Sequence, residues 1–338
     1  MVGRCILMGL ALALGVLPPP LPAQERPLGI ALEGFAYPFQ VAFFPVKIRG
    51  EELRVAYMDV APTAPGNGRA VLLLHGRNFP SSYWAPTVKA LTAAGYRVVA
   101  PDQLGFGKSS KPVFDYHFDD MAGTTAALLE KLQIEKLDVV GHSMGGMLAV
   151  RFARNYPQKV DHLVLESPIG LEDYRFYVPP IATDELIERE RNLSASEYRK
   201  QLMTNYSISL PPEAIEPFVE IRERVKESGE YNRWLHSFVN SYQMIYREPV
   251  VHEMPLIPQD TLFIIGADDH NAPGRAFAPP QARAKMGQNA ELAKELAAHM
   301  PAAQVAVVAG VGHLVHLEAE GQFNDLLLRF LGKARSTP

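Results

Sequence analysis

The chain has 338 residues and a formal net charge of −4, and 47% of its residues are hydrophobic and 21% charged. These values are ordinary for a globular protein and exclude a disordered chain. The 33 basic and 37 acidic side chains leave no positive excess that could drive nucleic-acid binding. The single cysteine, Cys5, excludes a disulfide framework and a cysteine-based zinc site. The length suits one large domain with an insertion.

Residues 1–23 have the plan of a secretory signal peptide. Arg4 precedes an apolar run from Cys5 to Leu17, which is followed by prolines and then by Ala23. The apolar run is shorter than the ~20 residues that a membrane-spanning helix needs. We therefore expect cleavage after Ala23, loss of Cys5 with the signal, and a secreted or periplasmic protein without a stable membrane anchor.

Eight short stretches are predicted to form β-strands. The first two alternate between outward and inward residues, whereas the other six are almost continuously apolar, which is typical of buried parallel strands. The predicted strands cover residues 41–48, 53–60, 70–74, 97–100, 137–140, 162–165, 261–265 and 305–309.

Helical patterns separate most of these strands, so the sequence predicts an α/β domain with a parallel sheet. The core helices are predicted at residues 87–94, 119–132, 145–156 and 321–331. Residues 168–258 break the alternation and contain only helical, aromatic-rich stretches. We interpret residues 168–258 as a helical cap, inserted into a core formed by residues 24–167 and 259–338.

The segment Gly141-His142-Ser143-Met144-Gly145 is a G-x-S-x-G motif between an apolar strand and a helix. This context is the one in which the motif forms a sharp turn that exposes the serine hydroxyl above the sheet. The glycines permit the strained backbone and close packing of such a turn. The sequence therefore predicts that Ser143 is a catalytic nucleophile.

A serine hydroxyl needs a general base, which we expect to be His313. His313 follows the strand predicted at residues 305–309 and precedes the last helix. That position places it on a loop at the end of a strand, where a base can reach the nucleophile. His316 is the alternative, but it lies closer to the helix.

The acid that orients the histidine should follow an earlier strand, because the partners of this motif come in the order serine, acid, histidine. Asp268 and Asp269 both follow the strand at residues 261–265, and we favour Asp269 because it is the third residue after the strand-ending Gly266. Glu166, at the end of an earlier strand, is a third candidate.

An oxyanion hole needs two N–H donors. We expect the first from Met144, next to the nucleophile, and the second from Arg77, in the loop that follows the strand at residues 70–74. Asn78 is the alternative to Arg77, through its backbone or its side chain.

Together these motifs resemble the α/β-hydrolase superfamily, in its cap-containing branch. The resemblance spans about residues 45–332 and rests on His75-Gly76 with Trp84, the segment from Pro101 to Ser110, the Ser143 motif, Gly266 to Asp269, and Gly310 to His313 with Glu318 and Phe323. It implies an eight-stranded, mostly parallel sheet, a cap after the sixth strand, and no cofactor or metal. Leu314 and Ala319 depart from the family's pattern outside the triad.

Resemblance also narrows the chemistry, because family members that open epoxides or displace halide use an aspartate where this chain has Ser143. The main expectation is a serine hydrolase (an esterase) that cleaves a small-molecule carboxylic ester, with an apolar or aromatic group suggested by the aromatic cap. The alternatives are a hydrolase of carbon–carbon bonds in ring-cleavage products, an amidase, or a non-catalytic binding protein on the same fold.

Overall fold

The computed structural model describes residues 27–332, so the predicted signal peptide with Cys5 lies outside the described residues. Over the described range, no helix is both long enough and apolar enough to cross a membrane.

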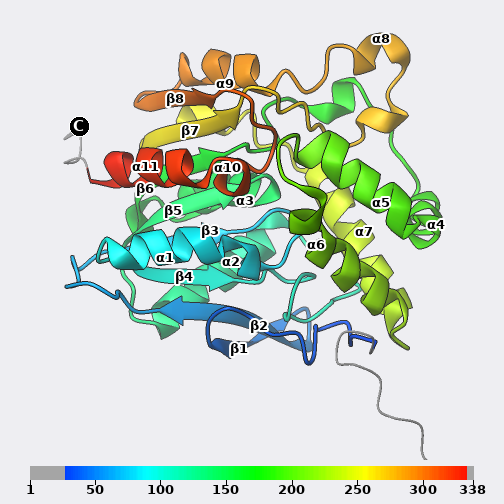
Figure 1. Cartoon of the computed structure of the whole chain (residues 1–338), viewed down its shortest axis with the longest axis horizontal. Helices are drawn as coiled ribbons and strands as arrows, with labels where there is room; N and C mark the ends of the chain where they lie inside the picture. The colour runs from blue at the N-terminus through cyan, green and yellow to red at the C-terminus, as the bar shows by residue number, and fades with distance from the viewer. Residues whose placement is uncertain (1–26, 333–338) are drawn as a thin grey trace, which may run out of the picture.

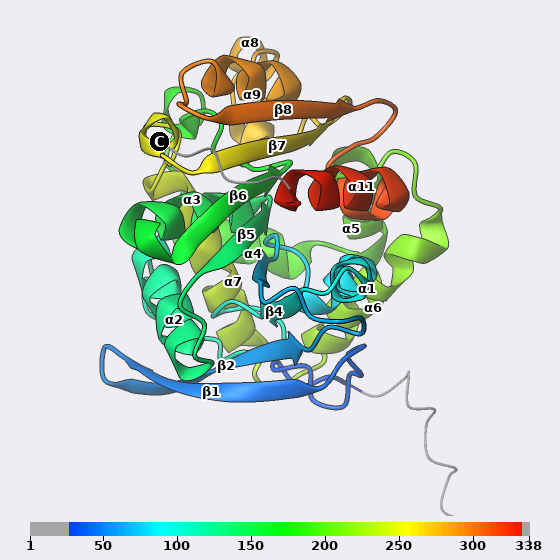
Figure 2. The ribbon, with the colours of Figure 1, turned by 90° about the vertical axis from the view of Figure 1, so that its left-hand side faces the viewer.

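The eight strands form a single sheet in the order β1-β2-β4-β3-β5-β6-β7-β8 (Figures 1 and 2). β2 pairs antiparallel with β1 and β4, and the remaining neighbours are parallel. This confirms the predicted eight-stranded, mostly parallel sheet. The strands are β1 (Val41–Ile48), β2 (Glu51–Val60), β3 (Ala70–Leu74), β4 (Arg97–Pro101), β5 (Leu137–His142), β6 (Val160–Glu166), β7 (Asp260–Gly266) and β8 (Ala303–Val308).

Helices cover both faces of the sheet, which explains why the central strands are apolar on both sides. In β3, Leu72 and Leu74 join a core with α2, α3 and α9, while Val71 and Leu73 join a core with α1 and α11. The helices outside the β6–β7 connection are α1 (Ala85–Ala93), α2 (Phe118–Lys131), α3 (Met144–Asn155), α8 (Pro280–Arg283), α9 (Asn289–Ala297), α10 (Val315–Glu318) and α11 (Glu320–Leu331).

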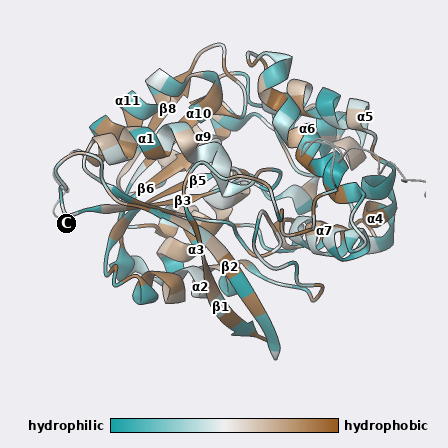
Figure 3. Ribbon diagram, turned by 60° about the horizontal axis from the view of Figure 1, so that its bottom comes forward, coloured by the Kyte–Doolittle hydropathy of each residue, from teal (hydrophilic) through white to brown (hydrophobic). Residues whose placement is uncertain are grey.

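Four helices between β6 and β7, here called the cap helices, gather at one side of the sheet (Figure 3). They are α4 (Thr183–Asn192), α5 (Ala195–Gln201), α6 (Pro212–Lys226) and α7 (Tyr231–Arg247), and a π-helical turn, Leu202–Tyr206, extends α5. The helical patterns within the predicted cap cover residues 194–206, 212–228 and 230–246, which correspond to α5, α6 and α7. No such pattern marks α4. Only Leu186 and Ile187 are buried in α4, so it lacks the apolar stripe that marks an amphipathic helix.

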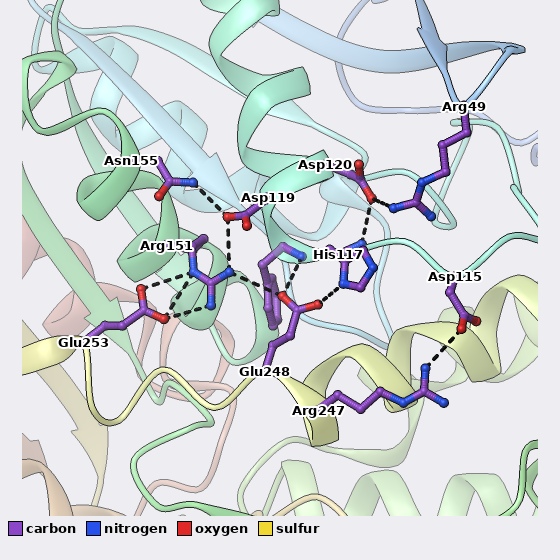
Figure 4. Close-up of polar contacts among 11 residues, drawn as sticks. Arg49, Asp115, His117, Asp119, Asp120, Arg151, Asn155, Arg247, Glu248 and Glu253 are labelled. Atoms are coloured by element: carbon purple, nitrogen blue, oxygen red, sulfur yellow. Dashed lines mark hydrogen bonds and ion pairs between the residues drawn. The ribbon is translucent and has the colours of Figure 1, made fainter.

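An ion-pair network fastens the chain where it leaves α7 (Figure 4). Arg151 on α3 donates to Glu253 at 2.8 Å, to Glu248 at 3.4 Å and to Asp119 at 3.1 Å. His117, just before α2, also pairs with Glu248. The cap therefore returns to the core through contacts with α2 and α3.

Candidate active site

Ser143 lies at the sharp turn between β5 and α3. Its φ of 56° and ψ of −119° are strained for a residue with a side chain, at a cost of about 1–3 kcal/mol. The turn is held by hydrogen bonds from the Ser143 N–H to the Glu166 carbonyl (3.1 Å) and from the Gly146 N–H to the Ser143 carbonyl (2.9 Å). A Cβ on Gly145 would lie 2.1 Å from the Leu74 carbonyl oxygen, so only glycine fits there.

His313 and Asp269 meet beside this turn. Nδ1 of His313 lies 3.0 Å from each carboxylate oxygen of Asp269, and both side chains are completely buried. On the other side of the ring, the Asn271 side-chain amide donates to Nε2 at 3.1 Å. An Nε2 that accepts a hydrogen bond carries no proton, so Nδ1–H points at Asp269. This is the tautomer that a general base requires.

The other candidate acids are placed differently. Asp268 is exposed, and its main-chain N–H donates to the Val311 carbonyl at 3.0 Å. Glu166 accepts two hydrogen bonds from His316, one from Nδ1 at 2.7 Å and one from the main-chain N–H at 2.8 Å. Neither Asp268 nor His316 therefore contributes to the pair formed by His313 and Asp269.

The expected oxyanion donors come from the two loops that flank the nucleophile. Met144 is the first residue of α3, where a main-chain N–H has no partner within the helix. Arg77 lies between β3 and the 3-10 helix Ser81–Trp84, in a loop fixed by the hydrogen bond from the Gly76 N–H to the Tyr83 hydroxyl (2.9 Å). The side chain of Asn78, the alternative donor, instead binds the cap through the Tyr206 hydroxyl at 2.5 Å.

His142 precedes Ser143 and contacts the loop that carries His313. Its Nε2 lies 2.9 Å from the His313 carbonyl, and its Nδ1 lies 2.9 Å from the Tyr83 hydroxyl. Burial, reinforced by the neighbouring His313, holds the pKa of His142 well below its usual value. A neutral His142 therefore donates to the His313 carbonyl and fixes the loop that carries the base.

A cavity of about 460 Å³ opens above Ser143, between the core and the cap helices. This volume suits a small molecule. Sequence reasoning assigned no role to Asn271, which also lines this cavity, because it does not stand in a recognisable motif. Within residues 27–332, no cluster of three or more histidine, cysteine, aspartate or glutamate side chains is arranged to hold a metal ion.

Residues 69–320 match a family model described as the alpha/beta hydrolase fold. The chain belongs to the α/β-hydrolase family. This confirms the resemblance drawn from the motifs around Ser143 and His313. Among solved structures, this α/β-hydrolase is similar to a probable hydrolytic enzyme of Pseudomonas aeruginosa PAO1, with 37% identity and a TM-score of 0.88. The match covers 91% of this chain and 99% of that one.

Two curated relatives of this α/β-hydrolase differ in how much of the chain they match. A 106-residue stretch is 44% identical to an uncharacterized protein of Mycobacterium tuberculosis. This match spans 31% of the chain and 31% of the length of that relative. A longer match, 30% identical over 290 residues, is to a 2-hydroxy-6-oxononadienedioate/2-hydroxy-6-oxononatrienedioate hydrolase of Burkholderia vietnamiensis. It covers 83% of this chain and 92% of that one.

Proposed function

We propose that this protein is a serine hydrolase that cleaves carboxylic esters through an acyl-enzyme on Ser143. The observation that carries the proposal is the pairing of His313 Nδ1 with both oxygens of Asp269, beside a strained turn that presents Ser143 to a cavity. This arrangement supplies a nucleophile, a base in the required tautomer and a buried acid that holds it.

In the first half of the reaction, the Ser143 oxygen attacks the ester carbonyl carbon while His313 Nε2 takes the hydroxyl proton. Nε2 exchanges its contact with the Asn271 amide for one with the hydroxyl, and such contacts commonly tighten only when substrate binds. The N–H groups of Met144 and Arg77 stabilise the negative oxygen of the tetrahedral intermediate. His313 then protonates the alcohol as the bond between the carbonyl carbon and the alcohol oxygen breaks.

In the second half, a water molecule replaces the alcohol. His313 takes a proton from this water as its oxygen attacks the acyl carbon, and the same N–H pair stabilises the second intermediate. His313 returns the proton to Ser143 as the acid leaves. Asp269 stays ionised throughout and stabilises the imidazolium that forms twice per turnover.

A fluorophosphonate probe tests the proposal directly, because it reacts with an activated serine. We expect the probe to label Ser143, and p-nitrophenyl esters of short acids to be hydrolysed. Ser143→Ala should abolish both, whereas Ser196→Ala, at an exposed serine of α5, should change neither. A folded protein that remains unlabelled and cleaves none of these esters would contradict the proposal.

Hydrolysis of a carbon–carbon bond is the second candidate, and the relatives favour it. The match to the Burkholderia vietnamiensis hydrolase covers 83% of this chain, and that protein is named for oxononadienedioate and oxononatrienedioate substrates. The same serine and histidine could cleave either an ester bond or a carbon–carbon bond. Comparing the rates on the two kinds of substrate therefore distinguishes the two candidates. A higher kcat/KM for a vinylogous 1,5-diketone than for an aryl ester of similar size would favour this candidate over the esterase.

A further inference from the structure

The side chain of Arg77 reaches from the loop after β3 to the underside of α7. Its Nε donates to Ser241 Oγ at 2.8 Å and its Nη2 donates to the Phe238 carbonyl at 3.0 Å. The guanidinium carbon also lies 3.7 Å from the centre of the Phe238 ring. These contacts fix the guanidinium at the wall of the cavity that Ser143 also lines, and within the described residues they engage two of its five N–H donors.

The Arg77 guanidinium forms no ion pair with a carboxylate of residues 27–332. Burial lowers the pKa of Arg77, and attraction to Glu190 offsets part of this effect. Glu190 is the one carboxylate among the described residues that line the cavity, and it pairs directly with Arg222. Since a guanidinium keeps its charge, one that is partly buried and has no carboxylate in direct contact favours the binding of an anion.

Three more arginines line the same cavity: Arg189, Arg275 and Arg283. Arg189 lies 4.5 Å from the Phe277 ring, while the other two donate to main-chain carbonyls. Four arginines and one carboxylate, Glu190, therefore line the cavity, in a protein whose net charge is −4. Such an excess of positive charge concentrates anionic molecules at the entrance.

We propose that the substrate carries a free carboxylate besides the bond that is cleaved, and that the Arg77 guanidinium binds this carboxylate. The inference rests on the proposed serine-hydrolase function and names its substrate class. The planar guanidinium matches a carboxylate in a two-pronged geometry. The aromatic cap residues led to the expectation of an apolar substrate. Some of them instead pack against each other, since Trp234 and Phe238 stack with ring centres 4.7 Å apart.

Two matched esters test the proposal. p-Nitrophenyl hydrogen adipate carries a free carboxylate, and methyl p-nitrophenyl adipate is the same molecule with that carboxylate masked. We expect kcat/KM to be at least about 10-fold higher for the acid ester. Arg77→Met should raise KM for the acid ester about 10- to 100-fold, so that the ratio of kcat/KM for the acid ester to kcat/KM for the methyl ester falls at least about 10-fold. Arg329→Met, at an exposed arginine of α11, should preserve the wild-type ratio.

Other outcomes separate this inference from the proposed function. If the wild type cleaves the methyl ester as well as the acid ester, the carboxylate site is overturned and the esterase stands. If neither ester is cleaved and the probe does not label Ser143, the proposed function fails. In that case, calorimetry of adipate binding to Ser143→Ala tests the carboxylate site by itself. An affinity that falls at least about 10-fold when Arg77→Met is added supports the site. Absence of adipate binding to Ser143→Ala overturns it.

A salt titration of the wild type covers the case in which Arg77→Met does not fold. Raising the ionic strength screens charge attraction, so KM should rise for the acid ester and stay nearly constant for the methyl ester. An equal response of the two esters would overturn the carboxylate site.

Discussion

Nδ1 of His316 lies 2.7 Å from Oε1 of Glu166, and both side chains are completely buried. The chain thus holds two histidine–carboxylate pairs near the nucleophile. The Glu166 carbonyl accepts the Ser143 N–H, and the His316 ring packs against Trp84 with centres 4.3 Å apart. This second pair sits among the contacts that hold the turn, so we assign it a structural role.

The two pairs should respond differently to neutralisation of their acids. Asp269→Asn should lower kcat for an aryl ester about 10³- to 10⁴-fold, because an amide cannot hold His313 in the required tautomer. Glu166→Gln should lower the free energy of unfolding by about 1–3 kcal/mol and leave kcat within about 10-fold of the wild type. Ester assays and urea unfolding measure both effects. If kcat of Glu166→Gln were as low as that of Asp269→Asn, Asp269 could not be singled out as the catalytic acid.

Gly145 is the position where an added methyl group should do most harm. Its Cβ in Gly145→Ala would lie 2.1 Å from the Leu74 carbonyl oxygen, and the backbone would have to move. We expect a loss of about 3 kcal/mol or more in stability, together with loss of ester hydrolysis. Gly321→Ala is the control: its Cβ meets nothing within 4 Å, and in helix α11 alanine should stabilise by up to about 1 kcal/mol. Equal melting temperatures for the two variants would refute the steric explanation.

Arg151 should be the main contributor to the network in Figure 4, because it pairs with three carboxylates while being mostly buried. Arg151→Met leaves Glu253 without its cation and Glu248 with His117 alone, and it should lower the free energy of unfolding by about 1–3 kcal/mol. Arg329→Met removes an exposed pair and should cost less than about 0.5 kcal/mol. Urea unfolding of both variants measures the two losses of stability. If Arg151→Met lost no more free energy of unfolding than Arg329→Met, Arg151 would not be the main contributor to the network.

Lys111 should make stability depend on pH above neutrality. Its Nζ donates to the carbonyls of Phe106, Gly107 and Ser109, and burial lowers its pKa to about 7. Because the folded-state pKa lies below the unfolded value of about 10.4, the unfolded chain holds more protons between these pH values. This residue therefore makes the free energy of unfolding rise with pH across that window, by at most about 1.4 kcal/mol per pH unit.

The pH effect of Lys111 is measured by urea unfolding from neutral to alkaline pH. Lys111→Met should remove the rise, while Lys89→Met, at an exposed lysine of α1, should retain it. A Lys111→Met protein whose stability follows pH as steeply as the wild type would show that Lys111 does not titrate in this range.

Features that depend on local sequence are predictable here. Two alternating stretches and six apolar runs predict all eight strands, and the predicted β1 and β3 agree with the structure at both ends. A strand buried on one or two faces leaves a clear hydropathy pattern. The turn at Ser143 is equally local, since neighbouring glycines set it. The positions of Asp269 and His313 follow from the strands that precede them, because parallel strands end at one edge of the sheet.

Features that depend on distant contacts are not predictable in this way. Asn271 reaches His313 only because the loops after β7 and β8 lie together, and nothing in its neighbours in sequence marks it. The Arg77 side chain in isolation resembles a solvated charge, and its place in the cavity is set by α7, more than 160 residues away.

The main-chain N–H of His313 donates to the carbonyl of Tyr206 at 2.8 Å, and the Tyr206 hydroxyl accepts from Asn78. One residue of the π-helical turn after α5 therefore contacts both the loop that carries His313 and the loop that carries Asn78 and Arg77. A swing of the cap away from the core would break both contacts at once. If the cap moves in this way to admit substrate, the turnover rate would scale with the fraction of molecules in which Tyr206 makes both contacts.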